Sequence, residues 1–594
     1  MNLNKMSPLL QLALIFPTYI SVEAFYQITS QNILQEEWKL IVQYHRDLEE
    51  LSNRVPFSYE TINGHFAFIT INKDLIADLS NERSVFYIEL PRVMQYIAVE
   101  NALTICAPQA IYTPQSYNVS GEGVIVAIMD SGIDYSHFDF RNEDGTTRVL
   151  AIWDQNLEGT PPPGFSSGAY FTKEQIDEAL SQPTQEERLT VVPSTDILGH
   201  GTAVTGVVAG NGRASGGQNQ GVAPKSDILV VKMSEQFYPD GTLIGPTNAD
   251  VMRGITFAIS QASMFNKPVS LMIGTGLNEG AHAGYSNLEI FIDQMSVVWP
   301  INMSVGTGNE ANKERHTSGT VVVGEVRDIQ ISIEPGEKFY TANLYKNFVD
   351  DMSFVIIAPN GEKTDILQDN INNVAYVFGN TSVLINISSA PFSARSQELI
   401  ILLEGFGTEF VDPGIWRIQI IGNAIVDGRY NVWATVTDQY RRGSRFLEPD
   451  PFTTLTIPST AHLITSIASI NGRTSQVLTT SGRGYTVDDR VKPDVSAPGL
   501  NVTVPQAGTE ALYTTMSGSS IATAFMCGAY ALFIQYGLQI RPDSYLYGEA
   551  LKGLVMRYAR KPSQFGTFPN QAYGYGILCI SDVLDELERI YGQQ

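Results

Sequence analysis

The chain has 594 residues, of which 43% are hydrophobic and 17% are charged, and its formal net charge is −24 at pH 7. This length exceeds what one hydrophobic core supports, so we expect two or three domains of an ordinary globular protein. The negative charge repels phosphate backbones and anionic lipid, and no run of five Lys or Arg residues offsets it, which argues against nucleic acid as a partner.

Cysteine spacing and the length of the apolar runs disfavour two further classes, disulfide-rich or thiolate metal proteins and membrane-spanning proteins. The three cysteines, Cys106, Cys527 and Cys579, form no CxxC pair, so we expect buried small side chains rather than a disulfide framework or a thiolate metal site. No uninterrupted apolar run approaches the ~20 residues that cross a bilayer, so no membrane span is expected.

The apolar stretch at residues 9–16 has two interpretations, the start of a secretory signal or a structural element of the first domain. The polar Gln11, the following Pro17 and the lack of a convincing A-x-A cleavage site favour a structural element. The compartment is therefore left open.

The first predicted unit lies between residues 37 and 90 and mixes strands with helices. Period-2 apolar runs at 40–44 and 65–71 predict strands, and the stretches 47–51 and 74–79 predict helices. We expect a small α+β unit.

From Gly121 the pattern changes to that of an α/β domain. The near-continuous apolar runs at 123–129 and 227–231 are typical of central strands in a parallel sheet covered on both faces, and 249–264 predicts a covering helix. α/β character returns after Pro451, with an apolar helix predicted near 520–536.

Between these two α/β stretches, residues 314–436 lose the helical pattern. Short strands with turn signals between them are predicted, for example at 321–323, 354–358 and 415–420. This region is expected to be an all-β, sandwich-like insert.

Four polar residues stand beside glycines at the ends of predicted elements: Asp130, His200, Asn309 and Ser520. The carboxyl ends of parallel strands are where α/β sheets build sites, flanking glycines allow close approach to an imidazole, and a hydroxyl at a helix start lies beside free N–H groups that can hold an oxyanion. Each also has an ordinary interpretation, as a turn Asp, a loop His, a turn Asn or a helix-cap Ser.

Taken in order, the motifs resemble the subtilisin family of serine proteases, whose triad runs Asp, His, Ser along the chain. The matching motifs are DSGID at 130–134, GHGT at 199–202, GVAP at 221–224, GNE at 308–310, KPDVSAPG at 492–499 and GSSIA at 518–522. The resemblance implies an α/β fold with a subtilisin-like doubly wound parallel sheet, an N-terminal α+β prodomain and an inserted all-β jelly-roll domain.

The β-rich insert between Asn309 and the Ser block is similar in placement to the clostridial Csp germination proteases, subtilisin relatives that keep an N-terminal prodomain. The resemblance implies self-cleavage near Gln95 or Tyr96, and a prodomain that stays bound without a covalent link. The implied domains are a prodomain at 1–96, a first catalytic part at 97–311, a jelly roll at 312–447 and a second catalytic part at 448–594.

The mechanism that the resemblance implies is acyl transfer with no metal or cofactor. Ser520 attacks the scissile carbonyl, His200 carries the proton and Asp130 orients the imidazole. Asn309 holds the oxyanion together with the Ser520 N–H, and the substrate backbone is expected to approach Gly274 and Gly308.

The sequence departs from the common family pattern at three places, which are Ala203 where many members have a second His, Thr523–Phe525 in place of Ser-Pro-His, and Ser270–Gly274 in place of the segment containing Ser-Leu-Gly. None of these removes a triad atom. The expectation is a change of specificity, not a loss of activity.

The resemblance implies a protein substrate, with the zymogen of a spore-cortex lytic enzyme as the narrow reading and a broad-specificity bacterial protease as the wider one. A spore-associated or extracellular bacterial location is favoured. Two alternatives are a pseudoprotease in germinant signalling, which the intact triad disfavours, and a lectin-like protein with Trp416, Tyr430 and Trp433 as its surface. We expect those aromatic residues to be core.

Overall fold

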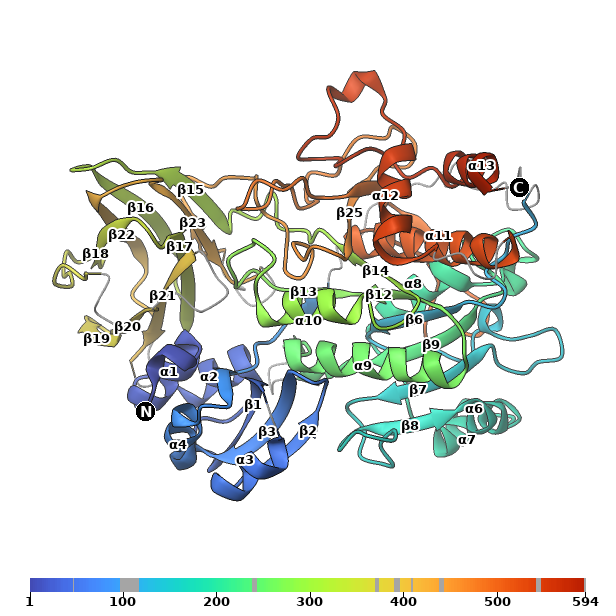
Figure 1. The fold of residues 1–594 in the computed structure, drawn as a ribbon, viewed down its shortest axis with the longest axis horizontal. Helices are drawn as coiled ribbons and strands as arrows, with labels where there is room; N and C mark the ends of the chain where they lie inside the picture. The colour runs from blue at the N-terminus through green and yellow to red at the C-terminus, as the bar shows by residue number, and fades with distance from the viewer. Residues whose placement is uncertain are drawn as a thin grey trace.

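The structure, a computed structural model, describes residues 1–45, 47–96, 117–237, 243–368, 373–388, 396–406, 410–436, 443–540 and 546–591. Figure 1 shows a β-rich unit and an α/β unit at opposite ends of the long axis, with an N-terminal unit below that reaches both.

The N-terminal unit is a four-stranded antiparallel sheet in the order β2-β3-β1-β4, with helices on one face. The other face of the sheet lies on the α/β unit, where Phe66 meets Phe291 edge to face. The elements are α1 (Pro8–Ile15), α2 (Val22–Thr29), β1 (Glu37–Tyr44), α3 (Leu48–Arg54), β2 (Ser58–Thr61), β3 (Phe66–Asn72), α4 (Ile76–Asn81) and β4 (Val85–Glu89).

The α/β unit is built on an eight-stranded sheet in the order β26-β25-β14-β12-β6-β9-β7-β8. Every neighbouring pair is parallel except β7 and β8. The strands are β6 (Ile125–Asp130), β7 (Val149–Asp154), β8 (Ala169–Thr172), β9 (Asp227–Lys232), β12 (Val269–Ile273), β14 (Ile301–Gly306), β25 (Thr465–Ile470) and β26 (Val495–Pro498).

Helices cover both faces of this sheet, as the continuous apolar strands predict. In β6, Val126 and Ile128 pack in the cluster with α8 and α11, whereas Ile125, Ala127 and Met129 pack in the cluster with α9 and α10. The helices are α6 (Lys173–Leu180), α7 (Gln185–Val191), α8 (His200–Ala209), α9 (Asn248–Met264), α10 (Asn287–Met295), α11 (Ser519–Ile540), α12 (Gly548–Tyr558) and α13 (Ile580–Tyr591).

Helix α11 is the one described helix that is long and apolar enough by composition to cross a membrane, over Ser519–Leu538. However, 94% of that stretch is buried inside the molecule, where it contacts α8 and the parallel sheet. It carries Cys527, which like Cys579 is buried and free, whereas Cys106 lies outside the described residues. The expectation of buried thiols is confirmed for these two.

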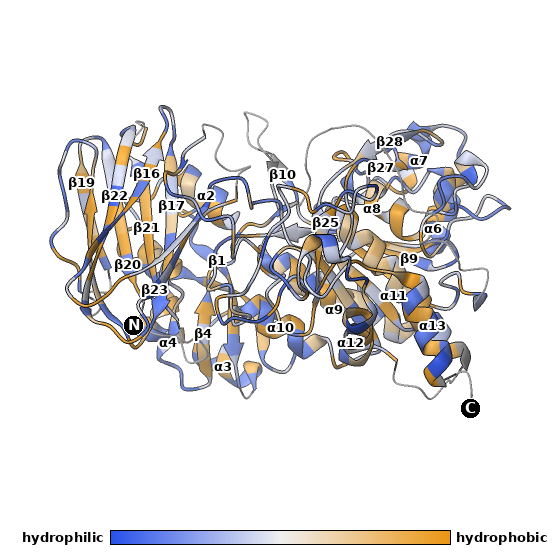
Figure 2. Ribbon diagram, turned by 90° about the horizontal axis from the view of Figure 1, so that it is seen from above, coloured by the Kyte–Doolittle hydropathy of each residue, from blue (hydrophilic) through white to orange (hydrophobic). Residues whose placement is uncertain are grey.

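The β-rich unit consists of two antiparallel sheets, β15-β23-β17-β21-β20-β19 and β18-β22-β16-β24. Figure 2 shows apolar residues gathered along its strands. The strands are β15 (His316–Thr320), β16 (Val326–Ile333), β17 (Phe339–Asn347), β18 (Asp351–Ile357), β19 (Asn373–Phe378), β20 (Thr381–Ile387), β21 (Ser396–Gly405), β22 (Gly414–Ala424), β23 (Arg429–Ala434) and β24 (Arg445–Phe446).

Two predictions about this unit have different outcomes. Trp416, Tyr430 and Trp433 are at most 3% exposed, so they are core and do not form the surface that a lectin-like site would need. The strand predicted at 321–323 is wrong, because this segment lies in the turn between β15 and β16 and is followed by Gly324 at φ +80°.

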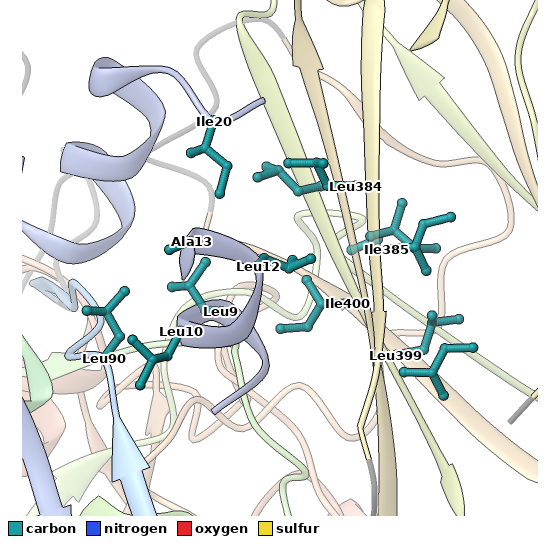
Figure 3. Close-up of a cluster of buried hydrophobic side chains, with 14 of the residues drawn as sticks. Leu9, Leu10, Leu12, Ala13, Ile20, Leu90, Leu384, Ile385, Leu399 and Ile400 are labelled. Carbon is teal, nitrogen blue, oxygen red and sulfur yellow. The ribbon is translucent and has the colours of Figure 1, made fainter. Parts of the chain in front are cut away.

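The apolar stretch near the N-terminus forms helix α1, which packs between the rest of the N-terminal unit and the β-rich unit. In Figure 3, Leu12 points towards the β-rich unit, where Leu384, Ile385 and Ile400 lie, and Leu10 points towards Leu90 of the N-terminal unit. The polar Gln11 is also buried. Its burial is tolerated because its amide nitrogen donates to two backbone carbonyls of the segment before α1. The stretch therefore forms a buried structural helix.

Replacing Leu12 should destabilise the protein. Leu12→Ala removes a fully buried side chain between α1 and the β-rich unit, and should lower the free energy of unfolding by about 3 kcal/mol. Leu34→Ala is the control, since Leu34 is 70% exposed and should change it by less than ~0.5 kcal/mol. Urea unfolding followed by fluorescence measures both, and equal effects would show that α1 contributes little to the interface.

Candidate active site

The three residues of the predicted triad meet at the carboxyl edge of the parallel sheet. Asp130 ends β6, His200 begins α8 and Ser520 lies in the first turn of α11. His200 Nδ1 is 2.6 Å from Asp130 Oδ1, and His200 Nε2 is 2.7 Å from Ser520 Oγ. One imidazole therefore hydrogen-bonds both other side chains.

The electrostatic setting of His200 suits a general base. Burial alone would lower the pKa of His200, but the charge and hydrogen bond of Asp130, with a smaller contribution from Asp196, raise that pKa above its ordinary value. Asp130 is itself fully buried and accepts a second hydrogen bond from the Ser131 N–H at 2.7 Å. The pair thus favours a protonated ring once a proton has been taken up.

A second buried carboxylate, Asp196, links the segments that carry Asp130 and His200. Its oxygens accept from Ser131 Oγ at 2.7 Å, from Gly199 N at 2.9 Å and from Thr202 N at 2.7 Å. The sequence reasoning missed this residue, although an acidic residue four positions before the candidate His was a usable signal.

Two glycines near the triad are required by the protein's own packing. A Cβ on Gly274 would lie 1.8 Å from Asp130 Oδ2, and a Cβ on Gly201 would lie 2.1 Å from the Gly132 carbonyl oxygen. The glycine at 201 therefore allows the backbone at Gly132, and not a substrate, to come close. The substrate contact expected at Gly274 stays a prediction.

Asn309 lies just beyond β14, against the start of α11. Its side-chain oxygen accepts from the Ser519 N–H at 3.2 Å, so the side chain is held against the residue that precedes Ser520, and the oxyanion role of its amide stays a prediction. Gly308 has a φ of +81°, and a Cβ there would lie 2.4 Å from Thr456 Cγ2, so glycine is needed for the local fold. A substrate contact at Gly308 stays a prediction.

The end of the N-terminal unit lies on the α/β unit as an extra strand. β5 (Gln95–Tyr96) pairs antiparallel with β13 (Thr275–Gly276), and the Met94 N–H donates to the Pro246 carbonyl on the other side. The Met94 side chain is fully buried. Because Gly274 precedes β13 and touches Asp130, the chain runs towards the triad as it reaches Tyr96, and residues 97–116 lie outside the described structure.

Comparisons with known proteins agree with this geometry. A profile of the subtilase family matches residues 121–576, and one of the Csp protease B prodomain matches residues 4–92. The solved structure of the CspB protease of Clostridium perfringens aligns with a TM-score of 0.73 and 29% identity, covering 81% of this chain and 96% of that one.

Curated relatives are more distant. The PI-type proteinase of Lactococcus lactis subsp. cremoris is 22% identical over 81% of this chain, and the minor extracellular protease Vpr of Bacillus subtilis is 22% identical over 78%. The chain spans 27% of the length of the first and 52% of the second. Because the subtilase profile covers most of the sequence and its motif residues meet in one hydrogen-bonded site, this chain belongs to the subtilase family and carries a Csp-type prodomain.

Proposed function

We propose that this protein is a serine endopeptidase that cleaves peptide bonds through a covalent acyl-enzyme. The observation that carries the proposal is the imidazole of His200 bonded at one nitrogen to Asp130 and at the other to Ser520. This arrangement makes a serine hydroxyl nucleophilic, since the base that takes its proton is already in contact.

The reaction follows from these contacts. Ser520 Oγ attacks the scissile carbonyl carbon while its proton passes to His200 Nε2, and Asp130 holds the opposite N–H of the ring. The oxyanion is stabilised by the Asn309 amide and the Ser520 backbone N–H. His200 then protonates the leaving amine, and water attacks the acyl-enzyme by the same route in reverse.

The first substrate in this proposal is the chain itself, cut near Gln95 or Tyr96. The pairing of β5 with β13 supports it, because an extended segment that adds a strand beside the triad is in the pose of a substrate. The chain direction, from Gln95 through Tyr96 towards Gly274, supports a scissile bond near these residues.

We further propose that the prodomain stays bound after cleavage. It contacts both other units, through Phe66 on α10 and through α1 on the β-rich sandwich. A polar contact adds to these, since Glu404 of β21 accepts from the Ser21 N–H at the start of α2 at 2.8 Å. Cutting one bond leaves all of these contacts intact, so the fragments should separate only when the interfaces unfold.

For the physiological substrate, we propose the zymogen of a spore-cortex lytic enzyme. The support is the Csp-type prodomain and the likeness to the CspB protease, which covers nearly all of that chain. A protease of broader use is the second candidate, favoured by the likeness to Vpr, a protease named as extracellular. The pseudoprotease alternative lacks support, because the triad is complete and hydrogen-bonded.

Self-cleavage should depend on Ser520. The expressed chain should split into a prodomain fragment and a larger fragment, with a new N-terminus just beyond Gln95 or Tyr96, whereas Ser520→Ala should stay intact. Denaturing gels and N-terminal sequencing measure this, and the two wild-type fragments should elute together in native gel filtration. An intact wild-type chain that does not react with a fluorophosphonate would contradict the proposal.

Loss of the Asn309 amide should slow turnover more than binding. Asn309→Ala removes one oxyanion donor and should lower kcat by roughly 10²–10³-fold with little change in KM. A fluorogenic peptide that spans the self-cleavage site provides the measurement. Asn423→Ala is the control, because Asn423 is an exposed residue of β22 in the β-rich unit and its amide donates to residues of the neighbouring strand β18. An equal loss of kcat at both positions would exclude the oxyanion role.

The pH dependence of kcat/KM should reflect His200. The ring must be neutral to accept the proton from Ser520, so activity should fall as the pH drops through a midpoint above 6.5, the ordinary pKa of His. Asp196→Asn removes one of the charges that raise this pKa and should move the midpoint to lower pH. Asp328→Asn, far along the sequence in β16, should leave it in place. A midpoint unchanged in Asp196→Asn would contradict the assignment.

A further inference from the structure

Six large apolar side chains are exposed together at one end of the β-rich unit. They lie in the turn between β15 and β16 and at the start of β16, in the turn between β17 and β18, and in the turn between β22 and β23. We call this set the apolar tip: Val322, Val323, Val326, Phe348, Val349 and Val426, each between 52% and 79% exposed.

Strand register places the three turns next to one another. Thr320 at the end of β15 pairs with Arg429 at the start of β23, and Lys346 near the end of β17 pairs with Tyr430. In the other sheet, Asp351 at the start of β18 pairs with Ala424 at the end of β22. The turn that carries Val426 therefore lies between the other two turns.

Hydrogen bonds fix the backbone of these turns. Asp350, which is 1% exposed, accepts from the N–H groups of Val426 at 2.7 Å, Asp427 at 2.9 Å and Gly428 at 2.9 Å. The Gly324 N–H donates to the Gly422 carbonyl at 2.8 Å. The apolar side chains are thus presented on a braced surface, which reduces the entropy that binding would cost.

The charges around the apolar tip narrow the choice of partner. Its edge carries Glu325, Asp351 and Asp427, while Arg429 is held by Asp427 at 2.9 Å and by Asp489 of the α/β unit at 3.2 Å. Arg327 and Lys346 are further cations near this edge, and Lys346 is buried with its ammonium bonded to the Asp350 carbonyl. With a net charge of −24 on the chain, a second copy or an anionic lipid surface would bring like charge to an acidic rim.

We propose that the apolar tip docks a short apolar segment flanked by Lys or Arg on a partner protein. Clusters of exposed apolar side chains with a polar rim mark interaction surfaces, and three turns offer room for one amphipathic segment. The flanking cations would meet the acidic edge, and the valines and Phe348 would be covered.

The test measures binding of a fluorescent synthetic peptide with a leucine-rich face flanked by lysines. Fluorescence anisotropy follows its binding to the full chain carrying Ser520→Ala, so that no peptide is cleaved and the result does not depend on protease activity. The tip variant combines Val322→Ser, Val323→Ser and Val426→Ser. The control combines Ile366→Ser and Val377→Ser, two exposed apolar positions outside the apolar tip, of which Val377 lies near the opposite end of the sandwich.

The tip variant should weaken peptide binding by at least about tenfold, whereas the control should bind as the parent does. Equal thermal midpoints in all three proteins would show that the fold is unchanged. Absence of binding, or equal binding by the tip variant, would overturn the proposal. Binding to phosphatidylcholine vesicles that the tip variant loses would assign the surface to lipid instead, and a dimer that it loses in sedimentation would assign it to a second copy.

Discussion

The two hydrogen bonds of the His200 imidazole constrain where the neighbouring strand and helices of the α/β unit can lie. His200 must reach Asp130 and Ser520 at once, so the end of β6 and the starts of α8 and α11 have to converge within the width of a ring. That convergence leaves no room for side chains in between, which is why Gly201 and Gly274 stand where a Cβ would overlap a backbone oxygen or the Asp130 carboxylate. The same convergence of elements therefore requires both the strand register of the parallel sheet and glycine at these two positions.

The N-terminal unit is held in place by contacts with both the α/β unit and the β-rich unit. Its sheet lies on α10, its helix α1 lies on the β-rich sandwich, and its last strand β5 enters beside the triad. A segment anchored in this way has a high effective concentration at the site, which favours the proposed self-cleavage and the proposed retention of the prodomain after the cut.

Much of the fold and the site follows from the sequence, because local patterns encode them. Continuous apolar runs predict the buried strands, and the order of the motifs predicts that Asp130, His200 and Ser520 meet in one site. What local pattern does not carry is long-range pairing. Asp196 is held by backbone N–H groups whose positions only the folded loop defines, and residues 321–323 look like a strand although Gly324 turns the chain there.

The place of the β-rich insert has a further consequence for the site. The end of β23 in the insert packs on the segment that follows Gly274. The Asn278 amide donates to the Ala434 carbonyl at 3.0 Å, and His282 stacks on Trp433 with 4.0 Å between ring centroids. Thr456, where the chain has returned from the insert, donates its N–H to Thr307 beside the oxyanion segment at 3.0 Å. An insert attached by a flexible tether would leave Asn309 free to shift, whereas this one braces the loop that carries Asn309, the proposed oxyanion donor.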